Sequence, residues 1–424
     1  MALDDMRPIQ ERCSNCSFCK WIPFDKQQSL RFAVACPSIG YYSWNTNSAR
    51  GRMQMGRALS AGDIGYTEKA VEIIHSCLSC GACDVSCKIC RYNMEPLENN
   101  MELKADAVSK GHILPVQAEM MESLKAEKTL IRGAKKADRT AWAKGLGIKD
   151  LTKEHADVMF FAGCKYSYDE KLQPLAREAA KLLLDAGTDL GFLAEAEMCC
   201  SGRAWQMGFF GEFKAHAENN IALIKKAGVK TIVTPCSDCY HAFKRLYAQL
   251  GLDVEVLHIV EFVERLINEG KIKFTKSLDI KVTYHEPCHL GRQGEPYGPW
   301  SGKEKKIRNQ IHTWDPPRPR YNGAYGIYDA PRNILKAIPG VELVEMERIK
   351  EYAWCCGAGG GCSETDKKLS EWTASERITE ANTTGADVLV TACPWCKSNL
   401  SGACGEDGKS IEVADLLELV RKAM

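Results

Sequence analysis

The grouping of cysteines constrains this chain more than any other feature. The sequence has 424 residues and 21 cysteines, most of them in short-spaced groups. Secreted disulfide scaffolds are typically short and begin with an apolar signal segment, whereas this sequence opens MALDDMRPIQERC, with charges throughout. We therefore expect a reducing, cytoplasmic setting. Dense cysteine there indicates metal ligation, and the number of cysteines favours iron–sulfur clusters over isolated zinc sites.

Charge and hydropathy exclude two classes of partner. Lys and Arg total 56 against 55 Asp and Glu, a net charge of +1, so no basic surface for nucleic acid is predicted. No stretch approaches the ~18–20 consecutive apolar residues that cross a bilayer, so the sequence predicts no membrane span of its own. Any association with a membrane is expected to depend on a partner.

The N-terminal cysteines form two ferredoxin-like runs. One is C-x2-C-x2-C from Cys13, followed at a distance by Cys36, and the other is C-x2-C-x2-C-x3-C from Cys77. Three closely spaced thiolates wrap one corner of a cubane cluster, and in two-cluster ferredoxins the fourth cysteine of each run ligates the other cluster. We therefore predict two [4Fe–4S] cubanes. Their expected ligands are Cys13, Cys16, Cys19 and Cys87 for one, and Cys77, Cys80, Cys83 and Cys36 for the other.

These runs depart from the ferredoxin pattern in two ways. The interval from Cys19 to Cys36 is longer than usual, and Lys88 follows Cys87 where proline is typical. Cys90 lies close by and competes with Cys87 for one ligand position. A pair of zinc ribbons is the alternative, but zinc sites pair cysteines two by two, whereas C-x2-C-x2-C places three ligands on one turn.

The rest of the chain predicts an α/β architecture. A cysteine-free segment rich in Ala, Lys, Glu and Met predicts a helical connector, and from residue 156 short apolar strands alternate with helical stretches, twice over. The expected fold is an α-helical ferredoxin-like domain with two cubanes, followed by two Rossmann-like domains related by duplication. The expected boundaries are 1–110 for the ferredoxin-like domain, 111–155 for the connector, and 156–275 and 276–424 for the two repeats.

The duplication is visible in the cysteines. The pattern C…CC…CxxC begins at Cys164 and again at Cys288. The first interval is longer in the second copy, and the excess falls near residues 293–321. The Pro, Gly and aromatic content of this stretch predicts an inserted irregular loop. Each CxxC follows an apolar strand, TIVTP or DVLVTA, which places it where α/β sheets bind cofactors.

These segments resemble a known family. FFAGC…EMCCSGRAW…TPCSDCY and YHEPCHLGR…WCCGAGGG…TACPWCKSN are similar to the paired CCG domains of the heterodisulfide reductase catalytic subunit. The N-terminal part, including SARGRMQMGRAL, resembles the ferredoxin-like subunit of that enzyme, and the fused order is typical of its membrane-linked form (HdrD-like). The resemblance implies two non-cubane [4Fe–4S] clusters. Carried over by position, Cys164, Cys199, Cys200, Cys236 and Cys239 would hold one, and Cys288, Cys355, Cys356, Cys393 and Cys396 the other.

Zinc, or a purely structural role, is the alternative for one of these sets. Three cysteines are left as free or auxiliary: Cys90, Cys362 and Cys404. Pairing of the repeats would bring the two non-cubane clusters face to face, with a substrate cleft between them.

Other residues near the cysteines carry weaker signals. The run Gly357–Gly361 lacks phosphate-loop spacing, and we expect it to bring backbone N–H groups close to a cluster. Three histidines suit proton donation to a cleaved thiolate or, as favoured here, hydrogen bonding that shapes the cluster loops: His241, His285 and His289. Three tryptophans exclude water or simply pack in the core, which is favoured: Trp205, Trp354 and Trp395. Four cations in the insertion suit an anionic substrate, an acidic partner or, as favoured, a solvated loop: Lys303, Lys305, Lys306 and Arg308.

The pattern predicts an iron–sulfur oxidoreductase subunit of a multi-subunit redox complex. Single electrons would arrive from a flavin-containing HdrA-like subunit, or another electron-transfer subunit, and leave to a partner catalytic subunit such as an aromatic acyl-CoA reductase-type assembly. The alternative is a dedicated disulfide reductase that cleaves a CoM-S-S-CoB-like heterodisulfide between the two non-cubane clusters. The insertion after Arg292 favours the relay, because it interrupts the region expected to border the cleft. No Ser-His-Asp arrangement is evident, so no catalytic side chain is assigned.

Overall fold

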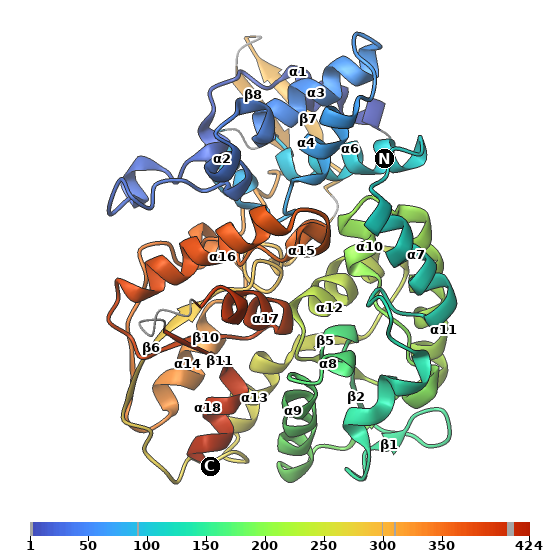
Figure 1. Cartoon of the computed structure of the whole chain (residues 1–424), viewed down its shortest axis with the longest axis vertical. Coiled ribbons are helices and arrows are strands. Elements are labelled where there is room, and N and C mark those ends of the chain that lie inside the picture. Colours follow the sequence, from blue (N-terminus) through green and yellow to red (C-terminus); the bar gives the residue numbers. More distant parts are fainter. Residues whose placement is uncertain (1–2, 91–92, 299, 309–310, 405–410) are drawn as a thin grey trace.

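Two parallel β-sheets organise the chain (Figure 1). The computed structural model describes residues 3–90, 93–298, 300–308, 311–404 and 411–424. The first sheet has the order β1-β3-β2-β4-β5 and the second β11-β10-β6-β9. The strands of the first are β1 (Lys149–Asp150), β2 (Val158–Phe160), β3 (Leu190–Phe192), β4 (Thr231–Thr234) and β5 (Glu255–His258). Those of the second are β6 (Ile280–His285), β9 (Val341–Leu343), β10 (Val388–Thr391) and β11 (Glu412–Asp415).

Helices surround both sheets. Those of the first repeat are α8 (Cys164–Tyr168), α9 (Gln173–Asp185), α10 (Gly202–Gln206), α11 (Phe210–Ala227), α12 (Ser237–His241), the π-helical η7 (Ala242–Tyr247) and α13 (Ile259–Asn268). Those of the second are α14 (Asp329–Ala337), α15 (Cys362–Thr365), α16 (Lys367–Asn382), α17 (Pro394–Gly402) and α18 (Leu416–Ala423). Strands β4 and β10 are buried along their whole length, as expected for parallel strands covered on both faces. The α/β prediction is confirmed.

The duplication extends to local capping. In each sheet, the strand that comes last along the chain leads directly into a helix, β5 into α13 and β11 into α18. The backbone N–H of His258 donates to Glu261 at 2.8 Å, and that of Asp415 donates to Glu418 at 3.2 Å. These capping boxes satisfy N–H groups that a helix start otherwise leaves without partners. One hydrophobic core runs through both repeats, and α13 packs against α14.

The N-terminal part is helical and lies over one end of the two repeats (Figure 1). Its helices are α1 (Arg7–Glu11), α2 (Pro37–Tyr42), α3 (Ala49–Ala61), α4 (Glu68–His75), α5 (Ala82–Cys90), α6 (Pro96–Ser109) and α7 (Pro115–Glu127). Its short 3-10 turns are η1 (Leu3–Met6), η2 (Phe18–Lys20), η3 (Phe24–Lys26) and η4 (Asn45–Asn47), and η5 (Lys136–Ala143) follows in the connector. Further 3-10 turns lie in the two repeats: η6 (Ala194–Ala196), η8 (Ala248–Leu250), η9 (Lys350–Tyr352) and η10 (Gly359–Gly361). The segment expected as a connector contains α7 and η5, and its end adds β1 to the edge of the first sheet.

The insertion is not an irregular loop throughout, and that prediction is wrong for its centre. Strands β7 (Lys303–Ile307) and β8 (Ile311–Asp315) pair as an antiparallel hairpin. All of β7 is exposed, so its sequence KEKKI lacks the alternation of apolar and polar residues that marks a half-buried strand. Arg12 Nη2 contacts Glu304 Oε2 at 3.1 Å, so the hairpin lies against the N-terminal part (Figure 1).

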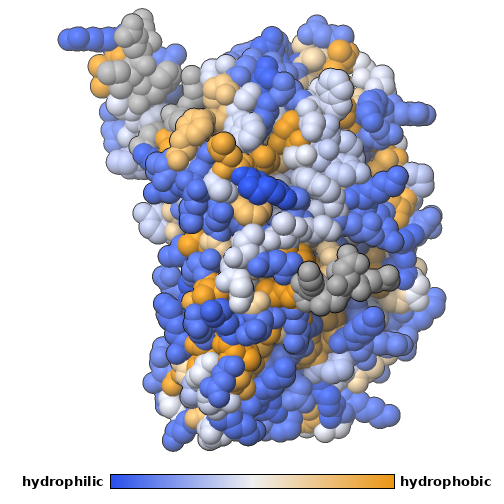
Figure 2. Space-filling model, turned by 60° about the vertical axis from the view of Figure 1, so that its left-hand side comes forward, coloured by the Kyte–Doolittle hydropathy of each residue, from blue (hydrophilic) through white to orange (hydrophobic). Residues whose placement is uncertain are grey.

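Among the helices that the structure describes, none is long and apolar enough to span a bilayer. Figure 2 shows a face on which hydrophilic residues predominate, with apolar residues interspersed among them.

Candidate metal centres

The first N-terminal thiol group, group A, comprises Cys13, Cys16, Cys19 and Cys87. Cys87 on α5 lies close enough to the other three thiols for their charges to raise its pKa, although burial is the larger cause. Burial likewise raises the pKa of Cys19 to about 12. Cys16 is exposed, and Cys13 and Cys87 are half-buried. Group A therefore reaches the surface. The side chain of Cys90 lies outside the described residues, so its competition with Cys87 stays untested.

The second N-terminal thiol group, group B, lines a small cavity of about 20 Å³ and comprises Cys36, Cys77, Cys80 and Cys83. Burial raises the pKa of Cys36 to about 11, and the Arg52 guanidinium opposes that rise. Asn100 Nδ2 donates to Cys77 Sγ at 3.6 Å. The cavity offers four thiols with a cation and an amide donor at its wall, a donor set that suits a soft metal or an iron–sulfur cluster.

Five buried thiols converge in the first repeat and form set 1: Cys164, Cys199, Cys200, Cys236 and Cys239. They come from the start of α8, the segment before α10, and the start of α12. Successive thiols are hydrogen-bond partners, from Cys164 through Cys199 and Cys200 to Cys239. The thiols of Cys199 and Cys239 lower the pKa of Cys200 to about 5. The backbone N–H of Ser201 donates to Cys199 Sγ at 3.3 Å.

The second repeat reproduces this arrangement in set 2: Cys288, Cys355, Cys356, Cys393 and Cys396. Cys288 pairs with Cys355, and the thiols of Cys355 and Cys396 lower the pKa of Cys356 to about 5. The backbone N–H of Gly357 donates to Cys355 Sγ at 3.4 Å, as Ser201 does in set 1. Both sets therefore present five thiols with the same internal order, which fits soft-metal or iron–sulfur chemistry.

The four thiol groups follow one another in space. Cys36 of group B lies close enough to Cys19 of group A for its charge to raise the pKa of Cys19. Cys80 of group B is a hydrogen-bond partner of Cys355 in set 2. Cys236 of set 1 is a hydrogen-bond partner of Cys393 in set 2. The groups therefore follow the order A, B, set 2, set 1. The sequence predicted that sets 1 and 2 would face each other, but not that group B would meet set 2, because residues so far apart along the chain carry no local signal of contact.

A buried lysine joins the N-terminal part to both repeats. Lys104 Nζ donates to the carbonyl of Cys77 at 2.7 Å, that of Gln206 at 3.1 Å and that of Gly360 at 3.4 Å. It also donates to Ser79 Oγ at 3.0 Å. Burial lowers the pKa of Lys104, since desolvation disfavours its charged form. No motif marked this residue in advance.

The glycine run brings two backbones together at the same junction. A Cβ on Gly359 would lie 2.4 Å from the carbonyl oxygen of Leu78, and one on Gly360 would lie 2.3 Å from that of Cys77. Gly360 also has a φ of +64°, a conformation that favours glycine. The run thus leaves room for the backbone of group B. Two of its backbone N–H groups also bond to set 2 thiols, that of Gly357 to Cys355 and that of Ala358 to Cys356.

Buried cations lie beside the repeat thiols. Arg139 Nη1 donates to Cys164 Sγ at 3.3 Å, and its Nε donates to Glu197 Oε1 at 2.9 Å. Arg203 pairs with Glu364 at 2.7 Å and lies 3.8 Å from the centre of the Trp395 ring. Such cations offset the negative charge of thiolates and their metals. Trp354 is buried with its Nε1 donating to Thr373 O at 2.9 Å, and Trp205 stacks on Phe210.

The histidines are held by hydrogen bonds or ring contacts. His289 Nδ1 lies 2.6 Å from Asp238 Oδ1, and its ring lies 4.8 Å from that of His241. Burial holds the pKa of His241 well below its usual range. Arg377 Nε donates to His285 Nδ1 at 3.2 Å. The bonds at His285 and His289 agree with the loop-shaping interpretation.

Two unassigned cysteines belong to none of the four groups, although the charge of Cys77 in group B contributes to the raised pKa of Cys362. Cys362 is fully buried, its Sγ donates to His75 O at 3.5 Å, and burial raises its pKa to about 12. Cys404 is half-buried, and its Sγ donates to Ile411 O at 3.3 Å.

One acidic cluster is an ion network. Asp84, Glu95 and Glu98 lie together, but Lys88 Nζ contacts Asp84 at 2.8 Å and Glu95 at 2.5 Å. Arg245 contacts Glu98 at 2.7 Å. Cations therefore already neutralise these carboxylates.

Comparison with known proteins identifies relatives of this arrangement. A family model described as a cysteine-rich domain (CCG) matches residues 158–244 and 319–401. The chain is 32% identical to the HdrD component of the dihydromethanophenazine:CoB–CoM heterodisulfide reductase of Methanosarcina acetivorans, over 98% of this chain and 94% of that protein. It is 28% identical to EtfAB:quinone oxidoreductase of Syntrophomonas wolfei, over 85% of this chain and 48% of that protein. It is also 28% identical to a probable iron-sulfur-binding oxidoreductase of Bacillus subtilis, over 83% and 47% of the two chains.

Proposed function

Because the chain belongs to the HdrD family of heterodisulfide reductase components and is an iron–sulfur oxidoreductase, we propose that it relays single electrons within a multi-subunit redox complex. Clusters held by its thiols would supply one-electron transfer. The protein's own contribution is to hold the four thiol groups in one order, to bury most thiols of group B and of sets 1 and 2, and to surround them with donors and cations.

We assign the ligands by group. Group A and group B would each hold a [4Fe–4S] cubane, in a ferredoxin-like domain of residues 1–110. Sets 1 and 2 would each hold a non-cubane [4Fe–4S] cluster, in CCG domains of residues 156–275 and 276–424, with residues 111–155 as the connector. The convergence of four or five thiols in each group supports this assignment, because soft sulfur ligands select iron–sulfur clusters or zinc.

The contact between Cys80 and Cys355 carries the proposal. It places group B beside set 2, and the contact between Cys236 and Cys393 places set 2 beside set 1. A contiguous order of redox groups is what a relay of single electrons requires. In that order set 2 lies between group B and set 1, and set 1 lies at the far end.

The exposure of group A supports a direction for the relay. Cys16 is exposed, whereas every thiol of sets 1 and 2 is buried except the half-buried Cys288. We assign group A as the point where electrons enter, served by a flavin-containing protein or another electron-transfer partner. A relative named for the electron carrier EtfAB supports this class of donor. The far end at set 1 would serve a partner catalytic subunit.

A thiol variant tests the order. Cys83→Ala removes one thiol of group B, and a matched Cys404→Ala removes a thiol outside all four groups. We expect Cys83→Ala to slow the reduction of set 1 and set 2 clusters by an artificial donor in rapid-mixing experiments, while Cys404→Ala leaves that rate unchanged. Equal rates in Cys83→Ala and the wild type would contradict the relay, provided that the iron content shows the group B cluster to be lost.

Disulfide reduction is the second candidate, and one observation favours it. The contact of Cys236 with Cys393 brings sets 1 and 2 together, as a site that holds both sulfurs of a disulfide would require. The insertion no longer argues against this candidate, because its hairpin lies against the N-terminal part through Arg12 and Glu304. Candidate thiols, coenzyme M and coenzyme B, separate the two functions, since only a disulfide reductase binds them at its clusters.

A further inference from the structure

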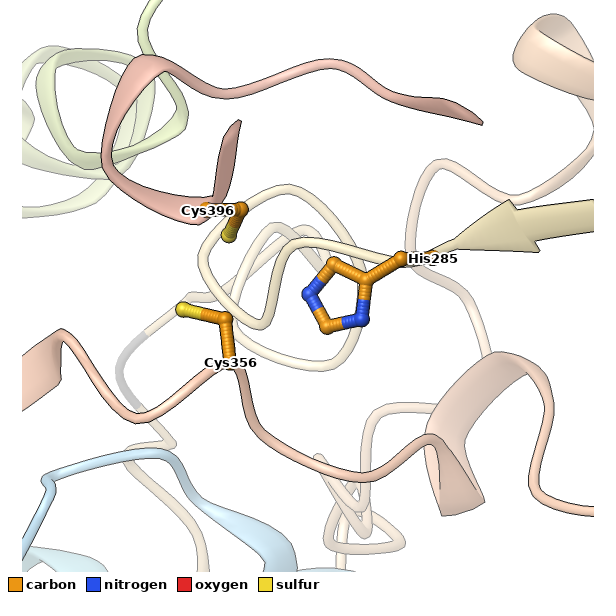
Figure 3. A group of neighbouring side chains, drawn as sticks. All are labelled: His285, Cys356 and Cys396. Atoms are coloured by element: carbon orange, nitrogen blue, oxygen red, sulfur yellow. The ribbon is translucent and has the colours of Figure 1, made fainter. Parts of the chain in front are cut away.

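One histidine lies directly against set 2. His285 ends strand β6, and its ring and the thiols of Cys356 and Cys396 have ligand atoms within 4.8 Å of one another (Figure 3). All three residues are buried. A His-Cys-Cys group is a possible metal site by residue type. Its hydrogen bonds decide whether the imidazole ligates or donates.

Arg377 fixes the tautomer of His285. A guanidinium nitrogen can only donate, so the bond from Arg377 Nε to His285 Nδ1, at 3.2 Å, requires a lone pair on Nδ1. The ring proton is then on Nε2, and a protonated nitrogen cannot ligate a metal. Arg377 is fully buried and held by Glu380 at 2.7 Å and by the Arg348 carbonyl at 3.0 Å, so it cannot turn away easily.

The free N–H points toward set 2. His285 Nε2 has no hydrogen-bond partner within the described part of the chain. Figure 3 shows the ring edge opposite the strand directed at the two thiols. A buried polar group without a partner is costly, so such a group usually faces a ligand or an unseen acceptor.

The first repeat is built differently at this position. Phe161 precedes Cys164 by the interval that separates His285 from Cys288, and its ring packs on Phe243 with centres 4.8 Å apart. A phenyl ring offers no N–H donor. Set 1 receives a donor from elsewhere, because Arg139 Nη1 contacts Cys164 Sγ at 3.3 Å.

We propose that His285 is a positioning residue that donates its Nε2–H to the sulfur of the set 2 cluster and raises the reduction potential of that cluster. Hydrogen bonds to cluster sulfur raise reduction potentials, because they stabilise the more negative, reduced form. The inference rests on the proposed function, since it requires a cluster at set 2. It makes the two repeats separately tunable, set 2 by a neutral imidazole and set 1 by a guanidinium.

Two substitutions at one position separate donation from packing. His285→Phe installs the residue of the first repeat, and His285→Gln keeps an N–H donor. In a potentiometric titration followed by electron paramagnetic resonance, we expect His285→Phe to lower the reduction potential of the set 2 cluster and to leave that of the set 1 cluster unchanged. A tenfold change in the equilibrium constant of a one-electron reduction corresponds to about 59 mV. His285→Gln should retain most of the wild-type potential. Phe161→Leu, which removes no N–H, is the control and should shift nothing.

Equal shifts in His285→Phe and His285→Gln would overturn the proposal, because packing alone would then explain them. A second measurement needs no variant. In wild-type protein with ¹⁵N-labelled histidine, we expect the weak nitrogen coupling of a hydrogen-bonded imidazole, and the strong coupling of an iron-bound nitrogen would overturn the proposal. Absence of iron and sulfide at set 2 would refute the proposed function, and an intact cluster that is indifferent to His285 would refute only this inference.

Discussion

Substitution of Gly360 by alanine tests the junction on which the order of the thiol groups depends. Gly360 and Gly385 have nearly the same φ, +64° and +67°, so alanine meets the same backbone strain at both positions, about 1–2 kcal/mol. At Gly385 an added Cβ meets nothing within 4 Å, whereas at Gly360 it lies 2.3 Å from the carbonyl oxygen of Cys77. The Gly385→Ala variant is therefore a matched control for strain without a clash.

The clash at Gly360 sets the expected magnitude. The Cys77 backbone must retreat by about 1 Å to restore ordinary contact, and such overpacking costs about 1–3 kcal/mol in well-packed interiors. We expect Gly385→Ala to lower the apparent free energy of unfolding by about 1–2 kcal/mol, and Gly360→Ala by about 2–5 kcal/mol. The retreat also pulls group B from set 2, because Cys77 and Cys80 belong to one segment. Electron arrival at set 2 should therefore slow only in Gly360→Ala.

Anoxic denaturation of the cluster-loaded protein, paired with rapid-mixing reduction, measures both effects. Equal losses of stability in the two variants, with equal rates of reduction, would refute the reasoning. They would show that the Cys77 backbone moves away from the added Cβ without loss of stability.

Three further predictions follow from buried groups. Arg139→Met leaves the Glu197 carboxylate buried without its partner and should cost about 3–5 kcal/mol, while Arg139→Met/Glu197→Gln should recover part of that loss in a thermal unfolding assay. Burial lowers the pKa of His258 to about 4, so the unfolded chain binds the extra proton first as pH falls below ~6.5. Stability should therefore fall by up to about 3 kcal/mol between pH 6.5 and 4, and His258→Asn, which retains a capping group, should flatten that dependence in denaturant titrations. Removal of iron by a chelator under reducing conditions should lower the unfolding temperature, since the buried thiols of sets 1 and 2 lose their shared partner, and an unchanged temperature would contradict metal ligation by these sets.

Local chemistry made much of the fold predictable. Buried runs such as TIVT and VLVT, each followed by C-x2-C, indicated parallel strands with cysteines at their carboxyl ends, and β4 and β10 lead into α12 and α17 in this way. The repeated cysteine pattern indicated a duplication, and the structure brings each predicted set of thiols together.

Long-range contacts were beyond the reach of the sequence. Nothing near Cys80 indicates that it meets Cys355, because the two lie in different parts of the chain and no local pattern encodes their contact. Lys104 looks like any helical lysine until three carbonyls from three segments converge on it. The β7 strand was missed because both of its faces are exposed, which removes the hydrophobic alternation that marks strands.

Electron paramagnetic resonance of the anoxically purified protein, oxidised and then reduced, with and without coenzyme M and coenzyme B, tests the relay most directly. The account predicts iron–sulfur signals that appear on reduction and that neither thiol changes. A new S = 1/2 signal that depends on an added thiol would contradict it, because it would show substrate sulfur binding at a cluster and would establish the disulfide reductase instead.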